Sequence, residues 1–160
     1  VAKYLLEFER GGGNAATGLA AGLAEVEGLI AALAQQSSES AVDQLLAQAA
    51  VLEMRISALR QMEDTVLAQL ARNHNPGPAS SLLKLLSSNT GQELAALRME
   101  VITYYSLPNN NRLILRGEPG IGPAAAHTAT AVYLNNRAST IFGGSNEVQK
   151  NIIAKSVLGL

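Results

Sequence analysis

"SAVDQLLAQAAVLEMRISALRQMEDTVLAQLAR", residues 40–72, carries a continuous helical pattern over more than thirty positions. Apolar side chains recur at spacings of three and four residues, which places them on one face of a helix. These apolar positions are Val42, Leu45, Ala49, Leu52, Ile56, Leu59, Val66 and Leu70. Glu63 interrupts the series, and the opposite face is polar. The stretch predicts a long amphipathic helix that packs against other helices.

Amphipathic segments of the same kind flank this stretch on both sides. Before it, Asn14 is the expected N-cap of a helix that ends near the polar break at residues 35–40. Its apolar face comprises Leu19, Leu23, Val26, Ile30 and Leu33. After it, "NHNPGP", residues 73–78, predicts a turn, because proline removes a backbone donor and glycine admits unusual dihedral angles. A third helix is expected from about Ala79 to Tyr105.

The last third of the chain begins with an irregular segment, residues 106–123, rich in Asn, Gly and Pro. A fourth helix is expected over 124–136. Gly143 and Gly144 then form a flexible elbow before Ser145, which is the expected N-cap of a fifth helix ending near Leu158. No strand-like alternation is sustained in the sequence. We therefore predict an all-α fold, an antiparallel four-helix bundle with an additional C-terminal helix.

Composition excludes several classes of function. The 160 residues suffice for one domain, and 12 basic against 13 acidic residues leave no basic stripe for nucleic acid or a membrane surface. Cysteine is absent, and His74 and His127 have no partner at ligand spacing, so no metal site is expected. The absence of cysteine fits a cytoplasmic protein, and no uninterrupted apolar run of membrane-spanning length and no secretion signal is found. Val1 is interpreted as a fragment boundary or a processed end.

Two short stretches suggest chemistry, and each has a purely structural alternative. The glycine elbow leads into a helix N-terminus that offers backbone amides to an anion, but an ordinary capped helix has the same sequence. In "EFERGGG", residues 7–13, Glu9 and Arg10 suit a base and an anion clamp beside closely approaching backbone. They equally suit solvated charges at a helix junction. The residues alone leave both choices open.

The two ends of the chain together resemble one family. "RASTIFGGSNEVQKNIIAKSVLGL", residues 137–160, resembles the C-terminal signature of acyl-CoA dehydrogenases, and "LLEFERGGG", residues 5–13, resembles the start of their C-terminal helical domain. The resemblance implies a single such domain over 1–160. Residues 1–13 would form the junction with a middle domain absent from this chain, residues 14–136 the bundle, and residues 137–160 the elbow and terminal helix.

Members of this family are flavoenzymes that introduce an α,β double bond into acyl-CoA thioesters. The resemblance implies FAD as cofactor, acyl-CoA as substrate, and assembly with identical or different dehydrogenase subunits. By position, Ser145, Asn146 and Glu147 match residues that contact FAD. Gly144 matches a residue that lines the acyl-CoA site. The isolated chain is expected to be inactive.

Many members of the family carry the catalytic base as a glutamate at the position where this chain has Gly143. A minority place the base at the start of the C-terminal domain in a Glu-Arg pair, which Glu9 and Arg10 match. Glu9 is therefore the candidate base and Arg10 the candidate contact to CoA, with Glu7 and Phe8 lining the same wall. The alternatives are a catalytically silent subunit and a helical scaffold or oligomerisation domain of a flavoprotein complex.

Overall fold

The computed structural model describes residues 14–35, 38–108 and 110–159, and over these ranges the chain is helical and contains no strand. The main helices are α2 (Ala15–Leu33), α3 (Glu39–Ala71), α4 (Ala79–Ile102), α6 (Ala129–Asn136) and α7 (Asn146–Leu158). A short helix α5 (Asn111–Leu115) and three 3-10 turns, η1 (Thr103–Ser106), η2 (Ala124–Ala126) and η3 (Arg137–Thr140), lie between them. The prediction of an all-α fold is confirmed.

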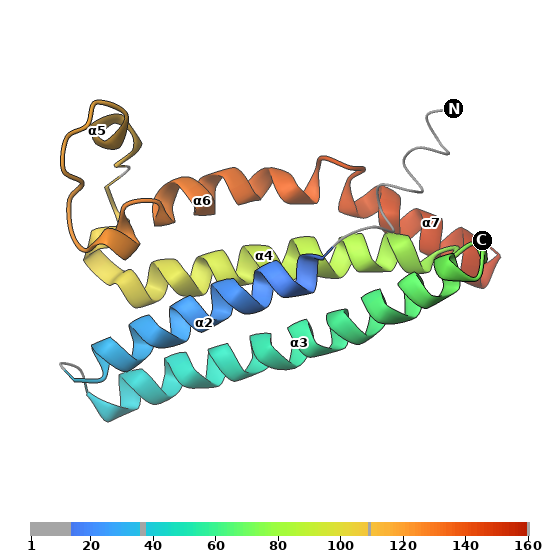
Figure 1. The fold of residues 1–160 in the computed structure, drawn as a ribbon, viewed down its shortest axis with the longest axis horizontal. Helices are drawn as coiled ribbons and strands as arrows, with labels where there is room; N and C mark the ends of the chain where they lie inside the picture. Colours follow the sequence, from blue (N-terminus) through green and yellow to red (C-terminus); the bar gives the residue numbers. More distant parts are fainter. Residues whose placement is uncertain (1–13, 36–37, 109, 160) are drawn as a thin grey trace.

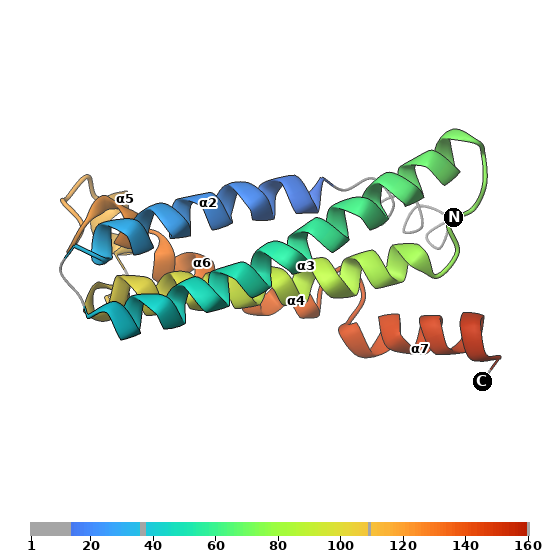
Figure 2. The same cartoon turned by 90° about the horizontal axis from the view of Figure 1, so that it is seen from below.

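The helices are arranged around α4. Along the chain α2, α3, α4 and α6 run alternately in opposite directions, as expected for an antiparallel bundle (Figure 1). α2 and α3 pack against each other and against α4, whereas α6 and α7 also pack against α4. Figure 2 shows α7 on the side of α4 that faces away from α2. α4 thus connects the three-helix core to the C-terminal segment.

The hydrophobic core lies between α2, α3 and α4 and follows the periodicity of the sequence. From α3 it takes Val42, Leu45, Ala49, Leu52, Ile56, Leu59 and Val66. From α2 and α4 it takes mainly Leu23, Val26, Ile30, Leu83, Leu94, Leu97 and Val101. Leu19, Leu33 and Leu70 are partly buried against this cluster. The predicted apolar faces of α2 and α3 are therefore the ones that pack.

Two predicted helices differ in detail from the structure. α4 ends at Ile102 rather than near Tyr105, because Thr103 has a positive φ of 56° and a 3-10 turn follows. The segment 124–136 begins with a 3-10 turn in which the N–H of Ala126 donates to the Pro123 carbonyl, and α6 starts only at Ala129. Proline fixes the chain direction here, and the tighter turn precedes regular helix.

The irregular segment 106–123 is tied back on itself. The Asn110 side chain, 1% exposed, donates from Nδ2 to the Ile121 carbonyl at 3.2 Å and accepts the Ile121 N–H at Oδ1 at 3.0 Å. A ring nitrogen of His127 lies 3.1 Å from the Gly122 carbonyl oxygen. These contacts close a loop that carries α5 at one end of the bundle (Figure 1).

α2 combines an apolar composition with one face that is buried in the core. In the part of the chain that the structure describes, it is the one helix long and apolar enough to cross a membrane by length and composition alone. Its buried residues Leu23, Val26 and Ile30 pack in the core, and a core helix of a soluble protein meets the same criteria.

Candidate functional site

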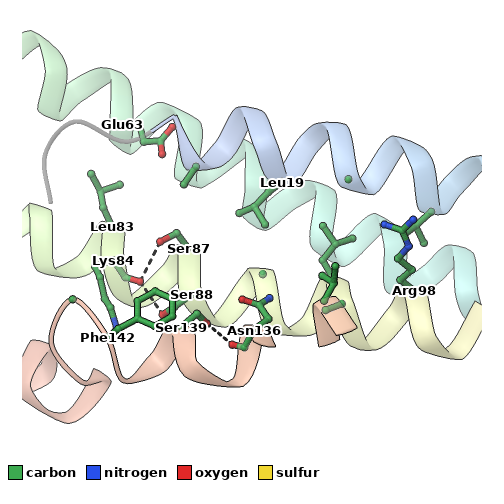
Figure 3. Close-up of a pocket in the computed structure, with 18 residues that line it drawn as sticks. Leu19, Glu63, Leu83, Lys84, Ser87, Ser88, Arg98, Asn136, Ser139 and Phe142 are labelled. Atoms are coloured by element: carbon green, nitrogen blue, oxygen red, sulfur yellow. Dashed lines mark hydrogen bonds between the residues drawn. The ribbon is translucent and has the colours of Figure 1, made fainter. Parts of the chain in front are cut away.

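A groove of about 620 Å³ runs along α4, between α2 on one side and α6 with the following elbow on the other (Figure 3). We call it the α4 groove. Its floor includes Leu83, Ser87, Gly91, Leu94 and Arg98, its α2 wall Leu19, Gly22 and Val26, and its other wall Val132, Asn136, Phe142 and Gly143. The floor follows α4 for roughly 20 Å, at 1.5 Å per residue. The lining is mainly apolar, with charged groups towards both ends and Asn136 near Gly91 between them.

The polar groups at the two ends differ in kind. Glu63 and Lys84 lie near one end of the α4 groove, together with the apolar Phe142, and Arg98 lies at the other end (Figure 3). A guanidinium nitrogen of Arg98 lies 3.3 Å from the Glu25 carboxylate, and another donates to the Ala125 carbonyl at 3.5 Å. The cation at that end is therefore bound to groups of α2 and of the segment before α6.

The elbow at Gly143 and Gly144 contributes Gly143 to the wall. Both residues have positive φ angles, 70° and 94°, which residues other than glycine rarely adopt. A Cβ atom built on Gly143 meets no atom within 4 Å. The glycine at this position is explained by its backbone conformation, since the surrounding space would admit a side chain.

Ser145 and Glu147 cap α7. The Ser145 hydroxyl oxygen accepts the Val148 N–H at 3.4 Å, as the sequence predicted for an N-cap. The pKa of the exposed Glu147 carboxyl lies below its ordinary value. The main cause is a hydrogen bond from its own backbone N–H, followed by one from the Ser145 hydroxyl, with Lys150 and Lys84 adding attraction. The first turn of α7 thus already carries a negative charge at its positive end.

Asn146 is buried and joins α7 to α4. Its Oδ1 accepts from Lys84 Nζ at 3.1 Å and from Ser88 Oγ at 3.2 Å. Its Nδ2 donates to Asn89 Oδ1 at 2.8 Å. Both polar atoms of the side chain are therefore engaged with α4. A contact from Asn146 to a cofactor would have to come from its backbone or from the second N–H of Nδ2, or replace these bonds.

Among the described residues, Glu63 is the one that contributes a carboxylate to the lining of the α4 groove. It is 8% exposed, and its two oxygens lie 3.2 and 3.4 Å from the Ala16 backbone nitrogen, whose N–H it accepts. Asn14 occupies the N-cap position of α2, but its side chain makes no capping bond. A charge from α3 therefore replaces the predicted local cap.

The predicted site residues divide into two groups. Gly143, Gly144, Ser145, Asn146 and Glu147 lie together at the elbow, on the wall of the α4 groove or directly after it. Glu7, Phe8, Glu9 and Arg10 lie outside the described residues, so their predicted roles remain predictions.

Sequence reasoning missed the roles of Glu63 and Gln149. Glu63 was visible only as a break in an apolar face, and its partner Ala16 lies 47 residues away. Gln149, fully buried, donates to the carbonyls of Gly143 and Gly144, yet its position in the sequence resembles that of any polar helical residue.

Comparison with known proteins gives one family. The family model described as acyl-CoA dehydrogenase, C-terminal domain, matches residues 1–158. A protein named acyl-CoA dehydrogenase IpdE1 from Mycobacterium tuberculosis is 38% identical over 109 residues, 67% of this chain and 23% of that protein. Its namesake from Mycolicibacterium smegmatis is 69% identical over 29 residues, 18% of this chain and 7% of that protein. The chain thus matches less than a quarter of either relative's length. No solved structure matches it significantly.

Proposed function

The chain belongs to the acyl-CoA dehydrogenase family through its C-terminal domain, and on this premise we propose that it is the helical domain of an FAD-dependent enzyme that oxidises an acyl-CoA thioester at its α,β bond. The observation that carries this proposal is the elbow, whose residues Phe142 and Gly143 line one end of a long, mainly apolar groove. Such a groove suits an acyl chain, with the reacting carbons near the elbow. Residues 1–13 would join the bundle to a middle domain.

The elbow also provides the groups that would face the flavin. When bound, FAD would supply the hydride acceptor for the reaction. The glycine backbone leaves the wall open at Gly143, which suits a flat ring system. Ser145 and Glu147 remain at the surface of the elbow, whereas the Asn146 side chain is bound to α4. We assign Ser145, Glu147 and the Asn146 backbone to the flavin side, and Gly144 to the acyl-CoA side.

Removal of the α proton requires a carboxylate that is free to accept it. Glu63 lines the α4 groove, but both of its oxygens lie within 3.4 Å of the Ala16 backbone nitrogen, whose N–H they accept, so we assign it to the start of α2. Gly143 offers no acid–base group. We therefore propose Glu9 as the base and Arg10 as a contact to the CoA portion, with Glu7 and Phe8 along the same wall.

We further propose that the domain works only in an assembly. The groove is open to solvent on its own, and catalysis of this kind needs water excluded from the reacting atoms. Phe142 and Leu158 are 62% and 68% exposed at the C-terminal end. Phe142 precedes α7 and Leu158 ends it, and large exposed apolar side chains that adjoin one another are typical of contact surfaces. Other domains and further dehydrogenase subunits, identical or different, would cover them in a cytoplasmic enzyme.

The second candidate is a catalytically silent subunit or scaffold, favoured by Gly143 at the usual position of the base. Anaerobic bleaching of flavin by an acyl-CoA thioester separates the two. We would compare the full-length protein with its Glu9→Gln and Glu7→Gln variants, the latter a matched change of a neighbouring carboxylate. Bleaching that is lost only in Glu9→Gln supports the proposal. Bound flavin that no acyl-CoA bleaches in the wild type supports the silent subunit, and absence of flavin supports the scaffold.

A further inference from the structure

Gln149, on the first turn of α7, has the most buried polar side chain of that helix. It is 0% exposed, and its Nε2 lies 3.2 Å from the Gly143 carbonyl oxygen and 3.4 Å from that of Gly144. One amide therefore donates to both carbonyls of the elbow. These two residues are the ones whose positive φ angles give the elbow its shape.

The other end of the Gln149 amide is not satisfied. Its Oε1 is buried and has no hydrogen-bond partner among the described residues. An unpaired buried acceptor costs the desolvation free energy that an apolar side chain of similar shape would avoid. Packing of α7 alone would thus favour leucine or methionine at this position. The amide gains its stabilising contacts through the elbow only.

The elbow needs such a restraint because glycine does not provide one. Before it, the N–H groups of Ile141 and Phe142 donate to the Ala138 carbonyl at 2.9 and 3.0 Å. After it, Asn146 is held against α4. Gly143 and Gly144 lie between these fixed points and have the broad conformational freedom of glycine.

We propose that Gln149 is a positioning residue, which holds the Gly143–Gly144 backbone and thereby fixes the wall of the α4 groove at Gly143. The inference rests on the proposed function in one respect, since acyl-CoA is taken as the ligand of that groove. The restraint of the elbow itself is independent of the ligand. The restraint should also raise the affinity for the ligand, because an ordered wall loses less conformational entropy on binding than a mobile one.

The test compares the full-length wild type with Gln149→Met, which removes the amide and keeps the length of the side chain. Asn151→Met is the control, because it introduces methionine at an exposed position of the same helix. Hydrogen exchange is measured on peptides covering residues 141–149 and on peptides covering α2. Melting temperature and the Kd for octanoyl-CoA are measured on the same samples.

We expect Gln149→Met to melt at or above the wild-type temperature, while exchange at the elbow becomes about tenfold faster and the Kd rises about tenfold. Asn151→Met should change neither the exchange at the elbow nor the Kd. Elbow exchange that stays at the wild-type rate overturns the inference, as does a lower melting temperature with faster exchange along all of α7. Should the Met variant not fold, Gln149→Ala provides the same comparison.

The two proposals fail in different ways. If the elbow exchanges faster in Gln149→Met but the wild type neither binds octanoyl-CoA nor shows flavin bleaching with it, the dehydrogenase proposal is overturned and the positioning role of Gln149 is supported. If the wild type reacts with octanoyl-CoA and Gln149→Met has the same Kd and the same elbow exchange, the positioning role is overturned and the dehydrogenase proposal remains.

Discussion

The Glu63 carboxylate on α3 accepts the backbone N–H of Ala16 at the start of α2, with oxygen–nitrogen distances of 3.2 and 3.4 Å. A helix start leaves backbone donors without intrahelical partners and has a partial positive charge, so a carboxylate there is stabilising. The contact links residues 47 positions apart and fixes where α2 begins against α3. Glu63 also lines the α4 groove, so the same contact shapes that end of it.

Replacing Glu63 should weaken the start of α2. We expect Glu63→Ala to lower the free energy of unfolding by about 1–2 kcal/mol, because a cap is lost and a buried donor is left unsatisfied. Asn14→Ala should change it by no more than a few tenths, as the Asn14 side chain makes no capping bond. Urea unfolding of both variants measures the difference. Equal effects would show that Asn14 caps α2 after all.

Asn146 offers a test of structural against cofactor-binding roles. Asn146→Ala removes its bonds to Ser88 and Asn89 on α4. We expect α7 to loosen by about 1–3 kcal/mol in protein freed of flavin as well as in loaded protein. Hydrogen exchange of α7 measures this, with the exposed Asn151→Ala as control. Loosening confined to loaded protein would instead indicate that the Asn146 side chain acts through the flavin.

The open space around Gly143 predicts that a carboxylate can be introduced there. Since no atom lies within 4 Å of a Cβ at this position, Gly143→Glu should fold, with a cost of about 1–2 kcal/mol from the left-handed backbone. Gly143→Ala should show the same cost and serves as the control.

If the subunit is silent only for want of a base, Gly143→Glu should gain flavin bleaching by acyl-CoA in the full-length protein, and Gly143→Ala should not. If Glu9 is the base, Gly143→Glu in a Glu9→Gln background should restore part of the lost bleaching. A folded, flavin-loaded double variant without any bleaching would argue against the elbow as the reacting end of the groove.

The stability of the start of α7 should depend on pH through Glu147. Its pKa in the folded protein lies below the ordinary value of 4.5, mainly because its own backbone N–H donates to the carboxylate. A lowered pKa means that folding favours the ionised form. The contribution is therefore complete above about pH 4.5 and is lost as the pH falls through the folded-state value.

Carbon-13 NMR titration of Glu147 measures the pKa directly. Exchange at Val148 and Gln149 should rise as the pH falls through the same window, after correction for the intrinsic pH dependence of exchange. Glu147→Gln should abolish the transition. A titration midpoint at or above 4.5 would contradict the assigned hydrogen bonds.

Local patterns predicted most of the helices, and distant contacts account for what they missed. The apolar face of α3 and the turn at 73–78 depend on side-chain spacing and on Pro and Gly, which the sequence displays directly. The cap of α2 depends on Glu63, whose meeting with Ala16 requires the packing of α2 on α3 to be known.

The same distinction holds at the elbow. The glycines and the Ser145 cap were identifiable from consecutive residues, and the structure confirms the cap. The roles of Asn146 and Gln149 were not identifiable from consecutive residues. Each depends on which face of α7 is turned towards α4 or towards the elbow. A resemblance to a family indicates which positions matter, but side-chain partners decide whether a residue is available for a ligand.

The position of α4 also bears on the order in which the domain is made. α2, α3 and α4 are consecutive in the chain and pack on one another, so their contacts can form while later residues are still being translated. The second wall of the α4 groove comes from α6 and Gly143, which leave the ribosome afterwards. A nascent chain arrested before Ala129 would already contain the helices of the core and would have no groove. Ligand can therefore stabilise only the finished domain, and cannot assist the first steps of its folding.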